Sequence, residues 1–460
     1  MDVGSRRRRV ASVASLTNMP ADARRLANRY FAYTGIYTLA ASVIWGINTL
    51  FLLGAGLSIT EVFIANAAFS VGTVLFEVPT GVVADTIGRR ASFLLSLVVL
   101  ATSTLLYVAL SGAGAGVVAF SLVSVLLGLG YTFYSGAMEA WVVDGIRARD
   151  YSGDLDRVFA RSQIISGIAI LIGTVGGGFL GQIDLAIPYL VRSALLVLLL
   201  AMAFVGMHDV GFQPRKVTWK TLPSEARSVA SDGLVNGWRP KPLRLVMVAG
   251  AVQNGFFFWA WYAWQPYFLE LVERDAVWVA GIVAGALSLA MILGTSLVGA
   301  FTKVCGRRTT LLAWAGLALA LSAVGVGLAD TFPIALAFLL ILAVAMGVTM
   351  PVRQAFVHGM VTSSQRATVV SLDSMVSGVG AIGGQVGLGV LADREGYSTG
   401  YVVGGVVALG AVPFIWLARR LRPDADAFAG SEGTEPSCPP VGLPAISSVE
   451  GLSVVRDEVL

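Results

Sequence analysis

The chain has 460 residues, of which 56% are hydrophobic and only 13% are charged. Soluble domains carry about 25% charged residues, so this composition excludes an ordinary soluble protein and predicts a chain embedded in a membrane. The two histidines and two cysteines show no metal-ligand spacing, so no metal site is expected.

Apolar segments predict twelve transmembrane helices, because about 20 residues of helix cross roughly 30 Å of hydrocarbon. In chain order, the first six are expected at 31–53, 60–84, 91–110, 116–144, 162–182 and 186–207. The second six are expected at 245–269, 277–301, 309–328, 332–357, 367–391 and 399–418. The fold class is therefore an all-α polytopic membrane protein.

Polar segments separate these helices into two groups. The five parts expected along the chain are a cytoplasmic head, a six-helix bundle, a cytoplasmic central loop, a second six-helix bundle and a cytoplasmic tail, at 1–30, 31–207, 208–244, 245–418 and 419–460. The tail is expected to be disordered, because it is rich in Pro, Gly, Ser and Glu. No cleavable signal peptide is expected, since the first apolar segment is too long for one.

The basic residues predict the orientation. All but three of the 32 Lys and Arg residues fall in the two termini and in the connections on one side; the exceptions are Arg192, Arg274 and Arg394. Basic residues collect on the cytoplasmic side, so both termini are expected in the cytoplasm of a plasma (inner) membrane protein. Nucleic acid is not an expected partner, because the bases are spread over many short loops instead of one face.

The two halves of the chain repeat each other. The segment "GVVADTIGRR" at 81–90 matches "GAFTKVCGRR" at 299–308, and "SGIAILIGTVGGGFLG" at 166–181 matches "SGVGAIGGQVGLGVLA" at 377–392. Six helices followed by six in the same orientation form a parallel repeat about an axis along the membrane normal. Transporters of this architecture bind substrate near the bilayer midplane, between the halves.

The segment "GVVADTIGRR" at 81–90 resembles the signature loop between helices 2 and 3 of the major facilitator superfamily, which is approximately G-x-L-A-D-[RK]-x-G-[RK]-[RK]. The residues that match are Gly81, Ala84, Asp85, Gly88, Arg89 and Arg90. Val83 and Thr86 depart from the pattern, and the second copy has Lys303 in place of the acid. The resemblance implies two parallel six-helix repeats and a transport function.

Further segments are similar to the drug:proton antiporter-like exporters of that superfamily. These segments are "FEVPTG" before the signature, "SGAMEAW" with Asp144 at the end of helix 4, and "QRATVVSL" entering helix 11. The glycine-rich helix 5 has Gly177 where the exporters' antiporter motif usually has proline. The resemblance implies export driven by the proton gradient, with no cofactor.

The signature loop itself suggests a latch. A carboxylate at Asp85 can accept hydrogen bonds from the N-terminus of a neighbouring helix, or pair with Arg89 or Arg90. Gly81 and Gly88 permit close helix contact and a tight turn. Such a cytoplasmic gating motif holds the halves together and breaks when the protein opens inward. The alternative is that the two arginines only anchor the topology.

Glu77 lies eight residues before Asp85, so it sits ~12 Å deeper along the helix. An ionisable group at that depth costs ~2.5–3.5 kcal/mol and by default marks an ion or proton pathway. Glu77 is therefore a candidate for proton coupling. The alternative is a permanently protonated side chain that serves as a hydrogen bond between helices.

Three other acids are proton-coupling candidates: Glu139, Asp144 and Asp373. Glu139 and Asp144 are five residues apart and lie on different helix faces, and Glu139 serves either as a functional acid or as a structural partner. Arg353 is placed to pair with Asp373, and a structural charge pair is favoured there over a coupling role.

Polar and aromatic residues at depth are candidates to line a substrate cavity, although such residues often only bridge helices. They are Asn48, Asn66, Tyr134, Gln163, Asn254, Phe257 and Trp261. Asn254, Phe257 and Trp261 share helical spacing, and either face a central cavity or join an aromatic belt at the outer interface. The segment at 264–268 is expected to belong to that belt.

The leading hypothesis is a monomeric secondary active transporter that exports small amphipathic molecules or drugs by alternating access, coupled to protons. Uptake, or transport of one dedicated metabolite, is the alternative within the same class. An enzyme is disfavoured because no nucleophile–base arrangement is present, and no Walker loop supports the use of ATP. A receptor is disfavoured because neither terminus resembles a folded output domain. The expected partners are substrate, protons and lipid.

Overall fold

The computed structural model describes residues 19–149, 151, 155–214, 234–273, 276–361, 366–421 and 426. The predictions made for most of the head, the middle of the central loop, the start of "QRATVVSL" and most of the tail lie outside these residues. The described part is helical throughout, apart from short connections, and contains no β-strand. Ten of its helices are long and apolar enough to cross a membrane.

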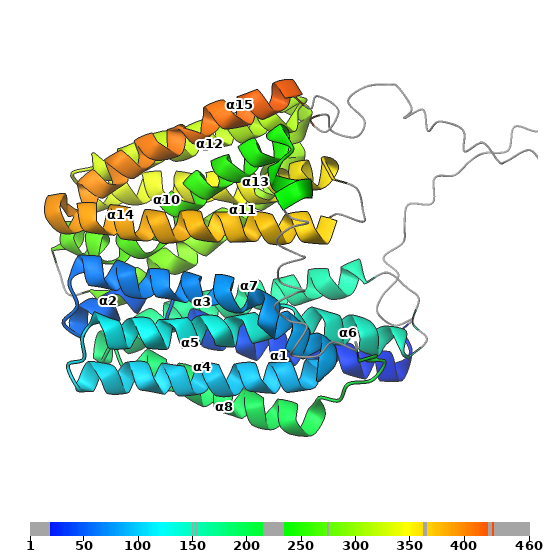
Figure 1. The fold of residues 1–460 in the computed structure, drawn as a ribbon. Helices are drawn as coiled ribbons and strands as arrows, with labels where there is room; N and C mark the ends of the chain where they lie inside the picture. The colour runs from blue at the N-terminus through cyan, green and yellow to red at the C-terminus, as the bar shows by residue number, and fades with distance from the viewer. Residues whose placement is uncertain are drawn as a thin grey trace, which may run out of the picture.

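The helices form two bundles (Figure 1). The first bundle contains α1 (Ala21–Ser42), α2 (Asn48–Gly54), α3 (Ile59–Thr86), α4 (Arg89–Gly112), α5 (Val117–Ser135), α6 (Ala137–Arg147), α7 (Asp156–Ile183) and α8 (Ile187–Gly206). The second bundle contains a π-helical turn (Leu234–Trp238), α10 (Lys241–Val272), α11 (Val277–Cys305), α12 (Arg308–Gly327), α13 (Phe332–Gly359), α14 (Arg366–Leu409) and α15 (Ala411–Leu421).

Ten candidate spans agree with twelve predicted passes once the breaks are considered. The first pass is divided between α1 and α2, so neither piece is long and apolar enough alone. The eleventh and twelfth passes are merged into one candidate span, within which Gly396 has a φ of 83° and turns the chain. The fourth pass is interrupted at Gly136, between α5 and α6.

The first helix begins ten residues earlier than the hydrophobicity predicts, at Ala21. The added turns are polar on average, but one face is apolar, and Ala23, Leu26, Ala27 and Tyr30 on that face are buried in the core of the first bundle. Packing of an amphipathic face therefore extends the helix beyond the apolar segment.

The bundles touch closely at one end of the molecule. We call the end that carries Arg89, Arg147 and Arg308 the basic end, at the right of Figure 1. The contacts lie toward the opposite end, called the sealed end. There the Thr49 N–H donates to Oε1 of Gln265 at 2.9 Å, and Nε2 of Gln265 donates to the carbonyl of Trp45 at 2.8 Å.

Glycines allow this close approach. A Cβ atom on Gly178 of α7 would lie 2.6 Å from the Cα of Gly281 on α11, so the two backbones cross in direct contact. Aromatic packing continues the seal, because Phe63 of α3 stacks on Trp259 of α10 with ring centroids 6.0 Å apart. Small residues at helix crossings are the usual means of close packing in membranes.

The contacts between the bundles end before the basic end is reached. Along α3, contact with α14 runs from Thr60, whose hydroxyl donates to Asp393 at 2.7 Å, as far as Val74, which lies against Gly378. Further along the same face, Glu77 is exposed and a Cβ on Gly81 would meet nothing within 4 Å. The described bundles are thus joined at the sealed end and separate toward the basic end.

Candidate functional site

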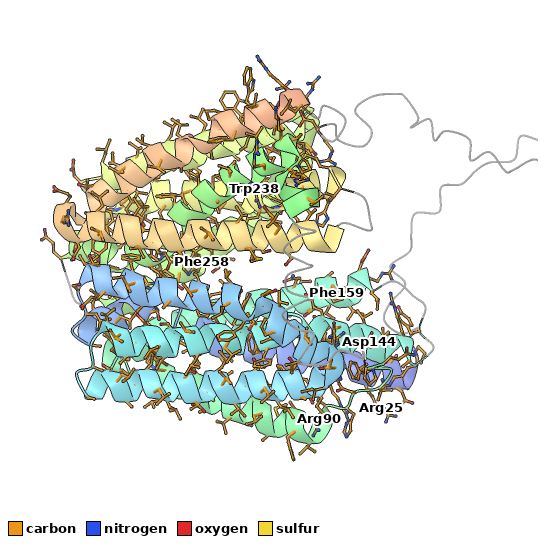
Figure 2. The ribbon with its side chains drawn as sticks, viewed as in Figure 1. Arg25, Arg90, Asp144, Phe159, Trp238 and Phe258 are labelled. Carbon is orange, nitrogen blue, oxygen red and sulfur yellow. The ribbon has the colours of Figure 1, made fainter. Side chains whose placement is uncertain are left out.

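The signature loop forms a network of charges at the basic end, where Arg90 and Asp144 lie (Figure 2). Nη1 of Arg89 donates to Oδ1 of Asp85 at 2.6 Å, and Nε of Arg89 lies 3.9 Å from Oδ2 of Asp144. The side chain of Arg90 donates to the carbonyl of Phe204 at 2.8 Å. These contacts tie the ends of α3, α4, α6 and α8 together.

The carboxylate that receives the N-terminus of α4 is Asp209, not Asp85. The backbone N–H of Arg90 lies 2.9 Å and 3.2 Å from the two carboxylate oxygens of Asp209. Gly88 has a φ of 124°, and a Cβ on it would collide with the Asp209 carboxylate. Glycine is therefore required at this position, both for the backbone conformation and for the approach of the acid.

Burial raises the pKa of the Asp209 carboxyl above its usual range, and the hydrogen bond from the Arg90 N–H opposes this shift. Asp209 was not predicted from the sequence, because it follows α8 in a short segment without a motif. The only available signal was an acid directly after a helix end, near the basic loop that it caps.

Every partner in this network belongs to the first bundle. A latch between the halves was expected, but in the described structure the hydrogen bonds and ion pairs of Asp85, Arg89, Arg90, Asp144 and Asp209 all stay within the first bundle and the segment after it. The reason is the separation of the bundles at this end. The network stabilises the connections of one bundle in the observed conformation.

A pocket of about 130 Å³ opens in the wall of the first bundle. Its lining comes from α1, α5, α6 and α7, and consists of Tyr30, Thr34, Tyr134, Ser135, Met138, Glu139, Phe159, Ser162, Gln163 and Ser166. Phe159, one of these residues, lies on the side of the first bundle that faces the second (Figure 2). The structure therefore brings together three residues singled out from the sequence: Tyr134, Glu139 and Gln163.

Glu139 is exposed to this pocket, in the first turn of α6, just after the break at Gly136. Within the described part of the chain it has neither an ion pair nor a hydrogen bond. Oγ1 of Thr34, in the same pocket, is buried and has no hydrogen-bond partner among the described residues. The pocket thus offers polar atoms whose bonding is incomplete.

In the second bundle, an ion pair fills the region that corresponds to this pocket. In helices 4 and 10, "GYT" at 130–132 matches "GVT" at 347–349, an offset of 217 residues that relates Arg353 to Gly136. The offset of 211 between helices 5 and 11 relates Asp373 to Ser162. Arg353 and Asp373 form the expected ion pair through Nη2 and Oδ1. Gly250 of α10 leaves room for the guanidinium, since a Cβ there would collide with it. One bundle therefore neutralises its acid internally, whereas the other leaves an acid facing a pocket.

The amide candidates bridge helices. Nδ2 of Asn48 donates to Oδ1 of Asn66 at 2.9 Å, and the Tyr189 hydroxyl donates to Oδ1 of Asn48 at 2.9 Å. Nδ2 of Asn254 donates to the carbonyl of Ser377 at 3.1 Å. These bonds hold the helices in register near the seam between the bundles.

The aromatic residues of α10 lie in the core of the second bundle or at the seam between the bundles, and not in the expected interfacial belt. Trp264 and Phe268 were expected in an interfacial belt, but only 2% of each is exposed, and both pack in the core of the second bundle. Phe257 and Trp261 are half-buried and adjoin each other at 5.8 Å. Trp261 meets Trp45 of the first bundle edge-to-face at 6.3 Å, so this group lies at the seam between the bundles.

Two parallel six-helix repeats, sealed at one end around a polar and aromatic seam, define a polytopic membrane transporter rather than an enzyme. The sequence profile of the Major Facilitator Superfamily matches residues 30–278 and 276–457. The chain therefore belongs to this superfamily.

Solved transporters share the fold at low sequence identity. The nucleoside transporter NupG superposes with a TM-score of 0.72 at 13% identity, over 85% of this chain and 98% of that one. A POT family transporter in complex with 5-aminolevulinic acid has a TM-score of 0.66 at 12% identity, over 86% and 96% of the two chains. The human organic anion transporter MFSD10 has a TM-score of 0.57 at 16% identity, over 86% and 100%. Among curated protein sequences, none matches this chain.

Proposed function

We propose that the protein exports small amphipathic organic molecules across the plasma membrane by alternating access, driven by proton entry. The observation that carries the proposal is the unpaired Glu139 at a pocket in one bundle, opposite an Arg353–Asp373 pair that fills the equivalent place in the other.

The basic end is assigned to the cytoplasm, because Lys and Arg concentrate on the cytoplasmic side of membrane proteins. The observed conformation is then open toward the cytoplasm and sealed toward the outside. The pocket, at the first turn of α6 and near the basic end of α7, is accessible from the cytoplasm in this state.

An isolated carboxylate in a membrane wall is costly, so it is retained where it exchanges a proton or receives a cation. Arg353 supplies the compensating charge in the second bundle, and no described residue does so for Glu139. A proton from solution is the simplest compensating charge. Glu139 is therefore the leading proton-coupling residue.

Glu77 is the second acid in the proposal. It lies on the face of α3 that contacts α14 at Val74 but is free nearer the basic end. Closure of the basic end would bring this face against α14 and change the hydration of Glu77. Access that alternates with conformation is what proton capture and release require.

The test is flux of a compound panel in proteoliposomes, with and without an imposed pH gradient. Glu139→Gln is expected to retain exchange of substrate down its gradient and to lose accumulation driven by protons. Glu61→Gln is the matched control, because Glu61 is a half-buried acid that closes a capping box with Ser58 at the sealed end of α3, away from the pocket. If Glu139→Gln responds to the pH gradient as the wild type does, the coupling role of Glu139 is refuted. If substrate accumulates in the direction of proton entry, the protein is an importer and not an exporter.

A further inference from the structure

The first bundle contains a cation that the motifs do not explain. Arg192 lies in α8, near its sealed end, within the membrane-spanning part of the helix. Its Nε atom is buried and has no hydrogen-bond partner in the described structure. The ion pairs formed by described residues do not include Arg192 either.

The groups that act electrostatically on this guanidinium are four phenols: Tyr37, Tyr189, Tyr107 and Tyr262. Carboxylates are absent from this set. Three of the tyrosines belong to the first bundle, whereas Tyr262 belongs to α10 of the second. The guanidinium therefore lies by the seam that opens and closes during alternating access.

Two of the four neighbouring hydroxyls form hydrogen bonds with other residues. The Tyr189 hydroxyl donates to Asn48, and the Tyr107 hydroxyl shares a hydrogen bond with Ser124. The ring of Tyr37 stacks on Tyr134 at 3.5 Å, which connects this region to the Glu139 pocket. The tyrosines thus enclose the charge without neutralising it.

A cation held in a membrane protein without a counter-ion costs several kcal/mol, unless an anion or water reaches it. Guanidinium presents parallel N–H donors that match a carboxylate, and it is always charged. An aromatic surface lies at the same seam, where Trp45 meets Trp261 and Trp261 adjoins Phe257. Trp261 directly precedes Tyr262 in α10.

We propose that Arg192 binds the carboxylate of an amphipathic organic anion, whose ring lies against Trp45, Phe257 and Trp261. This assignment rests on the proposed transport function and specifies its substrate class. Proton exchange takes place at Glu139, and anion binding takes place at Arg192, on the other side of the Tyr37–Tyr134 stack.

The test measures binding, not transport, so it does not depend on proton coupling. Purified protein in lipid nanodiscs is dialysed to equilibrium, without a pH gradient, against 2-naphthoate, 2-naphthamide or 2-naphthylmethylammonium. The three probes share a ring and differ in charge. Chloride and phosphate are added in separate arms, to distinguish an organic from an inorganic anion.

The wild type is expected to prefer 2-naphthoate over both other probes. Arg192→Gln should bind 2-naphthoate roughly 10- to 100-fold more weakly, because a hydrogen bond to a charged group is lost. Arg192→Lys keeps the charge without the paired donors and should show an intermediate loss. Arg394→Gln is the control, because Arg394 is an exposed arginine of the second bundle, two residues before the turn at Gly396, and its binding should match the wild type.

Removal of an unpaired charge should not unfold the protein, and a monodisperse gel-filtration peak verifies this for each variant. Equal binding of 2-naphthoate by the wild type and Arg192→Gln overturns the proposal. So does a preference for the amide or the ammonium probe, or Arg192-dependent binding confined to chloride and phosphate. Anion binding that persists while proton-driven flux is absent would refute the proposed function and leave this inference standing.

Discussion

The seal between α7 and α11 predicts that a single methyl group shifts the conformational equilibrium. In Gly281→Ala, the new Cβ would lie 2.7 Å from the carbonyl oxygen of Thr174 and 2.8 Å from the Cα of Gly178. Both are backbone atoms, so no side-chain rotation relieves the contact. The two helices must move apart by several tenths of an ångström.

The cost falls on the sealed state alone, because Gly281 meets the other bundle only when this end is closed. Overpacking costs ~1–3 kcal/mol, which corresponds to a shift of about 5- to 150-fold toward the state open at this end. Alanine has a higher helix propensity than glycine, by about 1 kcal/mol, so the control must also replace a helical glycine by alanine. Gly176→Ala does so, because a Cβ there meets nothing within 4 Å.

The assay measures the distance between spin labels at Ile183 and Leu328 by double electron–electron resonance. These residues lie on opposite bundles at the sealed end and are 75% and 67% exposed. Gly281→Ala should show a larger population of long distances than the wild type, and Gly176→Ala should not. An unchanged distance distribution in Gly281→Ala would show that this crossing does not limit opening.

Three further predictions concern the acids. Glu77→Gln should still bind substrate but lose uphill transport and its pH dependence, and full pH-dependent flux would reduce Glu77 to a packing role. Asp85→Asn removes the charge partner of Arg89 at 2.6 Å and should lower transport while membrane insertion, measured by expression, is retained; normal flux would contradict this. Because burial raises the pKa of Asp209, the folded protein keeps this proton to higher pH than the unfolded chain, whose usual value is 3.8. The resulting stability is present below the raised pKa and lost as pH rises through it, so Asp209→Asn should flatten the pH dependence of Tm in the acid range, and parallel curves would refute the assignment.

Helix number, the repeat and the signature loop were predictable, because each depends on local sequence. Apolar length identifies a membrane span without knowledge of its neighbours, and the match between "GVVADTIGRR" and "GAFTKVCGRR" reports the repeat directly. The pair of Asp85 and Arg89 is also local, since four residues place both side chains at one helix junction. The start of α1 was missed because packing, not hydrophobicity, holds its first turns.

The site required the tertiary structure, because its members come from helices far apart in the chain. Spacing alone did not indicate that Glu139 would face a pocket with Thr34 and Gln163, or that Asp209 would cap α4. Trp264 and Phe268 have the composition of an interfacial belt, yet rotation of α10 about its axis turns them into the core. From the sequence, Arg192 is one of three basic residues that lie outside the predicted cytoplasmic segments. Only the packing of α1, α4, α8 and α10 shows that tyrosines surround it without a counter-ion. The chemical character of each residue follows from the sequence, whereas its partners depend on how the helices are rotated and packed.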